Sequence, residues 1–243
     1  MRIFIIRHGD PDYVNDTLTE KGHREARLLA EKLSKEKIDY IYTSPMGRAK
    51  ATCMYTAKAL KMEEQVVVKD WLHEFDHALV LPSGENRPIL WDMLPEFWTK
   101  EEKMYDPKHW SEQAFYKAAG IDKAYAEVAN GLDSLLSEHG YVRDGGIYVT
   151  KAGNTKTLAF FCHFGLEMML LSHLCGLSPV VATHAFVALP TSLTTLYTEE
   201  RREGIASFRC CGFGDIGHLY AGNEPPSASA RFCEIFHSED RHD

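Results

Sequence analysis

The chain has 243 residues, of which 44% are hydrophobic and 26% charged, enough for one large domain or for a domain with a substantial insertion. Its formal net charge of -8 argues against a broad surface for nucleic acid or anionic membrane, and neither is expected as a partner. Recognition of an anion must therefore be confined to a local basic pocket.

The first 70 residues alternate between short apolar runs and helical patterns. Strands are predicted at residues 2–6, 38–42 and 65–69, and helices at about 19–33 and 47–60. Thr19 is a suitable N-cap for the first helix, whose apolar residues recur at helical spacing. The β-α-β-α-β order of these elements indicates a parallel sheet.

Further strands are predicted in the last third of the chain. A fourth strand is expected at residues 158–162, followed by a helix through Leu174, with two more strands near residues 192–197 and 205–211. These elements predict an α/β fold, a three-layer sandwich with a mostly parallel central sheet of about six strands and helices on both faces.

Residues 76–155 show a different pattern, in which aromatic side chains are scattered among charges and helices are predicted near residues 94–105 and 122–139. We interpret this segment as a helical cap inserted into a single domain that spans residues 1–243. Its aromatic residues favour the packing of such a cap over a dedicated substrate site. Residues 222–243 are rich in Pro, Ser and charged residues, which predicts a loosely ordered tail.

Residues that can carry chemistry directly follow three of the predicted strands. Arg7 and His8 follow the first, Ser44 and Arg48 the second, and His163 the fourth. The carboxyl ends of parallel strands share one edge of the sheet, so these side chains are expected to converge there. Unpaired cations are costly to bury in a core, whereas around a phosphate dianion guanidinium groups and helix N-termini supply donors. A neutral imidazole in that pocket can attack phosphorus, and a carboxylic acid at the rim can protonate the leaving group.

The stretch WLHEFDH, residues 71–77, contains the H-E-x-x-H spelling of a zinc-protease helix. On a helix the two histidines would lie on one face with the glutamate as general base, so a zinc hydrolase using His73, Glu74 and His77 is one hypothesis. The motif arises easily by chance in a chain with 12 histidines. Glu74 also follows the third predicted strand, which favours a role as the acid of a phosphoryl transfer.

Four motifs occur in a characteristic order along the chain. RHG follows the first strand, SPMGRAKAT the second, an acid the third and CHFG the fourth. This arrangement resembles the histidine phosphatase superfamily, also called phosphoglycerate-mutase-like, over residues 1 to about 220, with the cap as its variable part. Residues 7–13 read RHGDPDY and lack the R-H-G-x-R-x-P motif of one branch, so the chain resembles the other branch.

The resemblance implies a role for each matching residue. His8 would be the phosphorylated nucleophile, and Arg7, Arg48 and His163 would complete the phosphate pocket. Glu74 would be the proton donor. The implied activity is that of a metal-independent phosphomonoesterase, which acts through a phosphohistidine on a small phosphorylated metabolite and needs no cofactor or metal.

The chain departs from the family pattern at three points. Asn15 lies near the position of a phosphate-contacting asparagine in relatives, at a different spacing. Phe164 stands where glycine is more usual; its backbone can still donate to a phosphate, while its side chain would narrow the pocket. Residues 74–78 read EFDHA where the glycolytic mutases have Glu-Arg-His-Tyr-Gly, so residues that would clamp a phosphoglycerate are missing.

Three alternatives to this phosphatase stay open from the sequence: a phosphoglycerate-type phosphomutase, a non-catalytic module that binds a phosphoryl ligand, and the zinc hydrolase. The apolar run at residues 3–6 is too short for a signal peptide, and the one at residues 158–177 is interrupted by polar residues, so a cytoplasmic location is expected. The oligomeric state is not defined by the sequence, and a homodimer is one option.

Overall fold

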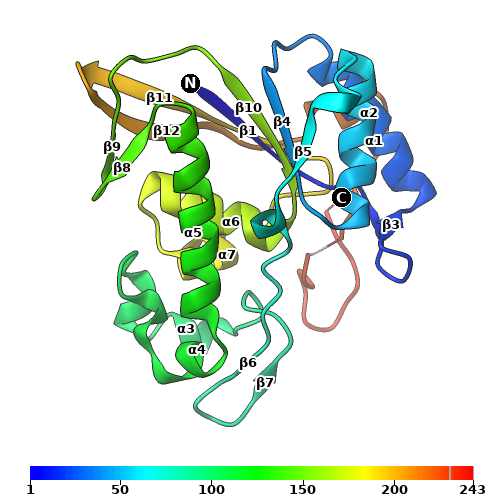
Figure 1. Ribbon diagram of the computed structural model, residues 1–243. Coiled ribbons are helices and arrows are strands. Elements are labelled where there is room, and N and C mark those ends of the chain that lie inside the picture. Colours follow the sequence, from blue (N-terminus) through cyan, green and yellow to red (C-terminus); the bar gives the residue numbers. More distant parts are fainter. Residues whose placement is uncertain (230, 243) are drawn as a thin grey trace.

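The computed structural model describes residues 1–229 and 231–242 and is built on one large twisted sheet (Figure 1). The sheet has eight strands in the order β5-β4-β10-β1-β11-β12-β9-β8. The predicted α/β sandwich with helices on both faces is confirmed. The sheet, however, has eight strands, where about six were predicted.

The first half of the sheet is parallel. It consists of β5 (Val66–Val68), β4 (Tyr40–Thr43), β10 (Thr157–Cys162) and β1 (Arg2–Arg7). Every residue of β10 is buried, and so is every residue of β1 after the first, which explains their continuous apolar sequences. The carboxyl ends of all four strands lie at one edge of the sheet.

The second half of the sheet continues with antiparallel pairing. It consists of β11 (Leu193–Arg202), β12 (Ile205–Asp215), β9 (Ile147–Val149) and β8 (Val142–Asp144). The hairpin β8–β9 accounts for the two strands that the sequence analysis does not predict. Its signal is the Asp144-Gly145-Gly146 turn, in which Gly145 has a φ of +55° that glycine adopts without steric cost.

Helices cover both faces of the sheet (Figure 1). They are α1 (Glu20–Leu33) and α2 (Gly47–Leu60) on one face, and α5 (Ile121–Glu138), α6 (Phe164–Cys175) and α7 (Pro179–Ala185) on the other. Successive strand residues point to opposite faces, so Phe4 and Ile6 pack in one hydrophobic core and Ile3 and Ile5 in the other. Thr19 caps α1, as predicted. No helix in the described part of the chain is long and apolar enough to cross a bilayer.

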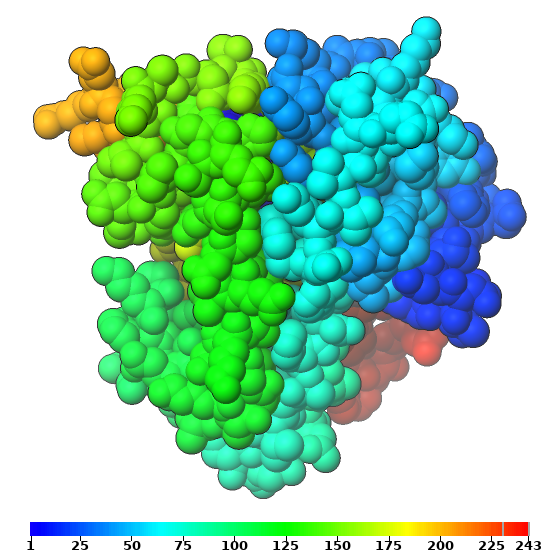
Figure 2. All heavy atoms as spheres, viewed as in Figure 1, coloured from blue at the N-terminus to red at the C-terminus, as the bar shows by residue number. Residues whose placement is uncertain are grey.

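The segment at residues 76–155 contains several short elements. They are β6 (Leu79–Val80), β7 (Asn86–Arg87), α3 (Pro95–Trp98), α4 (Ala114–Ala118) and 3-10 turns at Glu102–Tyr105 and Trp110–Glu112. The helix predicted near residues 94–105 is therefore two short pieces. α5 packs beside α6, and β8–β9 extends the sheet, so the end of this segment belongs to the sandwich. Figure 2 shows the earlier part, in cyan-green and green, at the bottom of the molecule.

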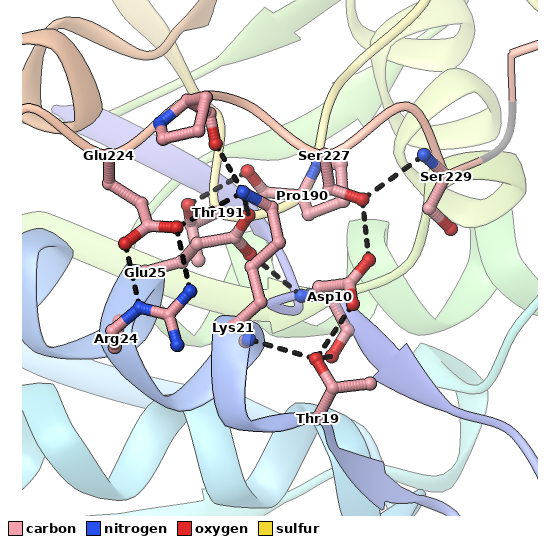
Figure 3. A network of polar contacts seen from close by, with 12 residues as sticks. Asp10, Thr19, Lys21, Arg24, Glu25, Pro190, Thr191, Glu224, Ser227 and Ser229 are labelled. Carbon is pink, nitrogen blue, oxygen red and sulfur yellow. Dashed lines mark hydrogen bonds and ion pairs between the residues drawn. The ribbon is translucent and has the colours of Figure 1, made fainter.

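The chain after the last helix, α8 (Gly217–Ala221), is held to α1 by polar contacts (Figure 3). Arg24 Nε donates to the Glu224 carboxylate at 2.8 Å. The Ser227 hydroxyl donates to the Asp10 carboxylate, which lies in the loop after β1. The first part of the tail is thus attached to the segment that follows the central strand.

Candidate active site

The residues predicted at the strand ends lie together at one edge of the sheet. β4, β10 and β1 are neighbours, and backbone hydrogen bonds continue past their ends. The His8 N–H donates to the carbonyl of Cys162 at 3.0 Å, and the Ser44 N–H to that of Phe161 at 2.9 Å. The extended ladder therefore fixes the backbone from which these side chains project.

The buried ring of His8 has one protonated and one unprotonated nitrogen. Its Nδ1 lies 2.7 Å from the carbonyl oxygen of Gly9. Because a carbonyl only accepts, Nδ1 carries the proton, and Nε2 of the neutral ring has a lone pair. Arg48 Nε donates to this Nε2 at 3.2 Å. Burial, followed by the charge of Arg7, lowers the pKa of His8 well below its ordinary 6.5, so the ring is neutral at pH 7.

Arg48 is held by an aspartate that the sequence analysis missed. Asp16 Oδ1 accepts from Arg48 Nη1 at 2.7 Å, and Asp16 Oδ2 accepts from the Gly47 N–H at 2.6 Å. Partial burial raises the pKa of Asp16, but these hydrogen bonds outweigh it and hold the pKa below its ordinary value. One carboxylate thus orients both the guanidinium and the first residue of α2.

Asn15, a candidate phosphate ligand from the family resemblance, lies on the surface of the loop that also contains Asp16. Its side chain donates to the Asp12 carboxylate at 2.7 Å, and its backbone N–H donates to the same group. These contacts close the turn between β2 (Pro11–Asp12) and β3 (Thr17–Leu18). In this position Asn15 shapes the loop that carries Asp16.

Arg7 is a nearly fully buried cation, with 1% of its surface exposed. Its Nη1 donates to the carbonyl oxygens of Ala188 at 2.7 Å and Ser229 at 3.1 Å. Among the described residues, Nε has no hydrogen-bond partner. Burial accordingly lowers the pKa of Arg7. The carboxyl groups of Glu74 and Glu167 oppose this shift from a longer distance. A buried guanidinium with an unused donor and no paired carboxylate is suited to bind an anion.

His163 completes the group from the end of β10. Its ring centre lies 5.1 Å from that of His8. Its Nε2 is 2.7 Å from the hydroxyl oxygen of Ser44, 119 positions earlier in the sequence. In the described part of the chain Nδ1 has no partner. Burial, and then the neighbouring His8, lowers the pKa of His163 well below 6.5, so this ring is also neutral at pH 7.

Glu74 reaches the same group from the segment that follows β5. Its Oε1 accepts from the N–H of Phe75 at 2.8 Å and from the N–H of Leu166, in the first turn of α6, at 3.1 Å. Burial raises the pKa of Glu74 above its ordinary 4.5, although both hydrogen bonds act in the opposite direction. The environment therefore favours a protonated carboxyl more than water does.

The zinc hypothesis is wrong because the helix that it requires is absent. The H-E-x-x-H residues follow a 3-10 turn at Asp70–Leu72 and are not helical. His73 Nδ1 is hydrogen-bonded to the carbonyl oxygen of Glu74 at 2.8 Å, and the His77 ring packs on Phe75 with 4.6 Å between centres. Residues 1–229 and 231–242 contain no group of three or more His, Cys, Asp or Glu that could hold a metal ion.

Phe164 is the first residue of α6, so its N–H has no carbonyl one turn earlier to bind. The Phe164 N–H is therefore the backbone donor that the sequence predicts for a bound phosphate. The Phe164 side chain is buried, and the Arg7 guanidinium lies 6.0 Å from the centre of its ring. The ring therefore forms a wall beside the site.

Glu167 is a second buried acid, and the sequence analysis missed it. It lies in the first turn of α6, is fully buried, and has no hydrogen-bond partner on either carboxyl oxygen among the described residues. Burial raises its pKa to about 8, while the nearby Thr194 hydroxyl and the charge of Arg7 lower it and the charge of Glu74 raises it. Its position four residues after His163, about one helical turn, is the signal that could have revealed it.

We call Arg7, His8, Arg48, His163 and Glu74 the strand-end cluster. It combines two guanidinium groups with two neutral imidazoles and a carboxyl whose protonated form is favoured by burial. Such a set can bind a dianion, present a nucleophilic nitrogen and deliver a proton.

The sequence pattern of the histidine phosphatase superfamily (branch 1) matches residues 3–210, and the chain belongs to this superfamily. This agrees with the resemblance drawn from the four motifs.

Individual relatives match only parts of the chain, at about 30% identity. Phosphoserine phosphatase 1 of Hydrogenobacter thermophilus is 31% identical over 147 residues, which cover 57% of this chain and 64% of that protein. A probable phosphoglycerate mutase of Serratia proteamaculans is 29% identical over 72 residues, 26% of this chain and 34% of that protein. The chain thus spans less than two thirds of the length of these curated relatives.

Solved structures of low sequence identity share the fold. A phosphoserine phosphatase mutant from Entamoeba histolytica, crystallised with phosphoserine, has a TM-score of 0.59 at 19% identity, covering 90% of this chain and 98% of that one. A mycobacterial glucosyl-3-phosphoglycerate phosphatase in complex with VO3 has a TM-score of 0.57 at 18% identity, covering 88% and 98%. These likenesses concern the fold alone.

Proposed function

We propose that this protein is a metal-independent phosphomonoesterase that acts through a phosphohistidine on a small phosphorylated metabolite. The observation that carries the proposal is the orientation of His8. Its Nδ1–H is held by the Gly9 carbonyl, so the lone pair of Nε2 lies among Arg48, His163 and Arg7. A neutral nitrogen surrounded by buried donors is suited to attack a bound phosphoryl group.

The first chemical step follows from these positions. His8 Nε2 attacks phosphorus while Arg7, Arg48 and His163 hold the remaining phosphoryl oxygens. The bond from nitrogen to phosphorus forms as the bond from phosphorus to the leaving oxygen breaks. Glu74 gives its proton to that oxygen, so the alcohol departs uncharged.

The second step regenerates the enzyme. The Glu74 carboxylate takes a proton from a water molecule whose oxygen attacks phosphorus, and the bond to His8 Nε2 breaks to release inorganic phosphate. The pKa shifts suit this cycle, because burial keeps His8 neutral as a nucleophile and raises the pKa of Glu74 toward that of a useful acid.

Hydrolysis is favoured over mutase activity by the residue after the acid. Where the glycolytic mutases carry an arginine, this chain has Phe75, whose side chain is fully buried in the hydrophobic core. Phe75 offers no charge to a second phosphate. The phosphoryl group on His8 is therefore expected to pass to water.

The proposal is tested by phosphate release from p-nitrophenyl phosphate in excess chelator, together with trapping of an acid-labile phosphoenzyme. We expect turnover by the wild type and a loss of about 10³-fold or more in His8→Ala, without a phosphoenzyme. His77→Ala is the matched control, because only a zinc mechanism needs that histidine. Turnover that survives His8→Ala would overturn the proposal. Thermal stabilisation by phosphate without any turnover would indicate a binding module instead.

A further inference from the structure

A large, mainly apolar cavity opens beside the strand-end cluster. Its volume is about 520 Å³, within the range of small-molecule sites. Aromatic residues from four separate segments line it, namely Trp91, Trp98, Phe164, His184, Phe186 and Phe232. We call this cavity the aromatic pocket.

The aromatic pocket begins where the leaving group of a phosphomonoester must lie. Trp91 and Glu74 flank the same glycine: a Cβ atom at Gly165 would fall 2.3 Å from the Trp91 ring and 2.9 Å from Glu74 Oε1. The Phe164 ring contacts the Trp91 ring edge-on at 5.3 Å between centres, and its centre also lies 6.0 Å from the Arg7 guanidinium. A phosphoryl group held at Arg7, with its leaving oxygen at Glu74, therefore directs the rest of the substrate into this pocket.

The charges of the pocket are already compensated. Of the lining residues, Asp92 forms an ion pair with Arg87 at 3.8 Å, and Arg231 forms one with Glu234. His184 also lines the pocket, but burial lowers its pKa, so its ring is neutral at pH 7. A substrate carboxylate would lose its hydration here without gaining a dedicated cation, which is costly.

His184 is an uncharged part of the pocket wall. Its Nδ1 lies 2.7 Å from the carbonyl oxygen of Val180 and must carry the proton, so Nε2 is an acceptor. Nε2 is buried and has no partner in the described part of the chain, while the Trp98 ring lies 5.1 Å away between centres. The His184 ring therefore adds neither a charge nor an exposed donor to the pocket.

We propose that the aromatic pocket binds the leaving alcohol of the substrate and selects an uncharged alcohol that bears an aromatic ring. This inference rests on the proposed phosphomonoesterase function, because the strand-end cluster fixes which end of the substrate enters the pocket. Flat rings pack well between tryptophan and phenylalanine side chains. Phosphomonoesters that carry a carboxylate, such as phosphoserine and 3-phosphoglycerate, are poorer substrates, because the pocket would remove water from the carboxylate without offering it a cation.

The experiment compares substrates whose leaving groups have similar chemistry. 2-Phenylethyl phosphate and O-phosphoserine are both esters of primary alcohols. Their difference in kcat/KM therefore reports mainly on how the pocket binds the rest of each alcohol, the phenyl ring or the amino acid. We expect 2-phenylethyl phosphate to be preferred by about 10- to 100-fold. In Trp98→Ala the kcat/KM for 2-phenylethyl phosphate falls about 10-fold, while that for phosphoserine changes less than about 3-fold.

Two further variants sharpen the result. Leu94→Arg places a cation at the rim of the pocket, since Leu94 lines it and is 44% exposed, and is expected to raise kcat/KM for phosphoserine severalfold. Tyr220→Ala removes an aromatic ring that is 69% exposed and lies outside the pocket, and should leave the preference unchanged.

The possible failures are distinguishable. If phosphoserine is hydrolysed as well as 2-phenylethyl phosphate, or if Trp98→Ala leaves their ratio unchanged, while His8 is still required for turnover, the selectivity inference is overturned and the phosphatase proposal stands. If neither these esters nor p-nitrophenyl phosphate is hydrolysed, both fall together.

Discussion

The strand-end cluster and the aromatic pocket meet at Phe164, yet the two regions are built in opposite ways. The cluster buries polar side chains, with Arg7, His8 and His163 each no more than 1% exposed. Its histidines and arginines come from the ends of neighbouring parallel strands or from the first turns after them. The pocket is mainly apolar, and the insertion, the start of α6, α7 and the tail supply its walls.

We expect this difference to separate catalysis from substrate selectivity. Hydrogen-bonded strands hold their ends about 4.8 Å apart, which fixes the relative positions of reactive groups. The walls of the pocket belong to segments that share no ladder and can change without disturbing the sheet. We therefore expect substitutions in the cluster to reduce turnover of every substrate, and those in the pocket to change which substrate is preferred.

Glu74→Gln provides the strongest test within the cluster, because it keeps an acceptor for the two backbone N–H groups but removes the transferable proton. We expect kcat for alkyl phosphates to fall by about 10²- to 10³-fold. The p-nitrophenyl ester should lose much less, since its leaving group departs readily as an anion. Glu167→Gln is the matched variant and should affect both substrates alike. Equal losses with both esters in Glu74→Gln would mean that Glu74 is not the acid.

Glu167→Gln tests the burial of the second acid through the pH dependence of stability. The folded pKa of Glu167 is about 8, above its ordinary 4.5, so its stabilising contribution is complete below about pH 4.5 and is lost as the pH rises through 8. Between pH 5 and 8 the free energy of unfolding of the wild type should fall, relative to the variant, by up to about 1.4 kcal/mol per pH unit.

Urea titrations of both proteins at pH 5, 6.5 and 8 measure this slope. Burial also raises the pKa of Glu25, to about 7, but Glu25 titrates in both proteins and cancels in the difference. Parallel stability profiles would show that Glu167 is ionised at neutral pH and has a partner in solution.

Asp16→Asn is expected to have the smallest effect. The Asp16 side chain is 45% exposed, and ion pairs of this kind contribute about 0–1 kcal/mol. With Arg48 held less firmly, KM for p-nitrophenyl phosphate should rise about 2- to 5-fold with little change in kcat. Asn15→Ala serves as the neighbouring control, with a smaller change expected. A lower KM in Asp16→Asn would show that the carboxylate competes with the substrate phosphate.

Much of the sheet was predictable because its signals are local. Continuous apolar runs identify β1 and β10, and the polar residues directly after them identify the reactive edge. The hairpin β8–β9 escaped prediction because each strand has only three residues. The H-E-x-x-H motif gave a wrong prediction because its residues fit a helix, whereas the chain there is not helical and Glu74 contacts Leu166.

The sequence by itself determined the α/β class, the order of the strands that carry chemistry and the family to which those residues point. These follow from hydrophobic periodicity and from the rule that parallel strands end at one edge. Only the tertiary structure decided that Asp16 holds Arg48, that Glu167 is buried near Arg7, and that four distant segments enclose an aromatic pocket. Such burial and contacts leave no pattern in the local sequence, because they join segments that are far apart along the chain and meet only after folding.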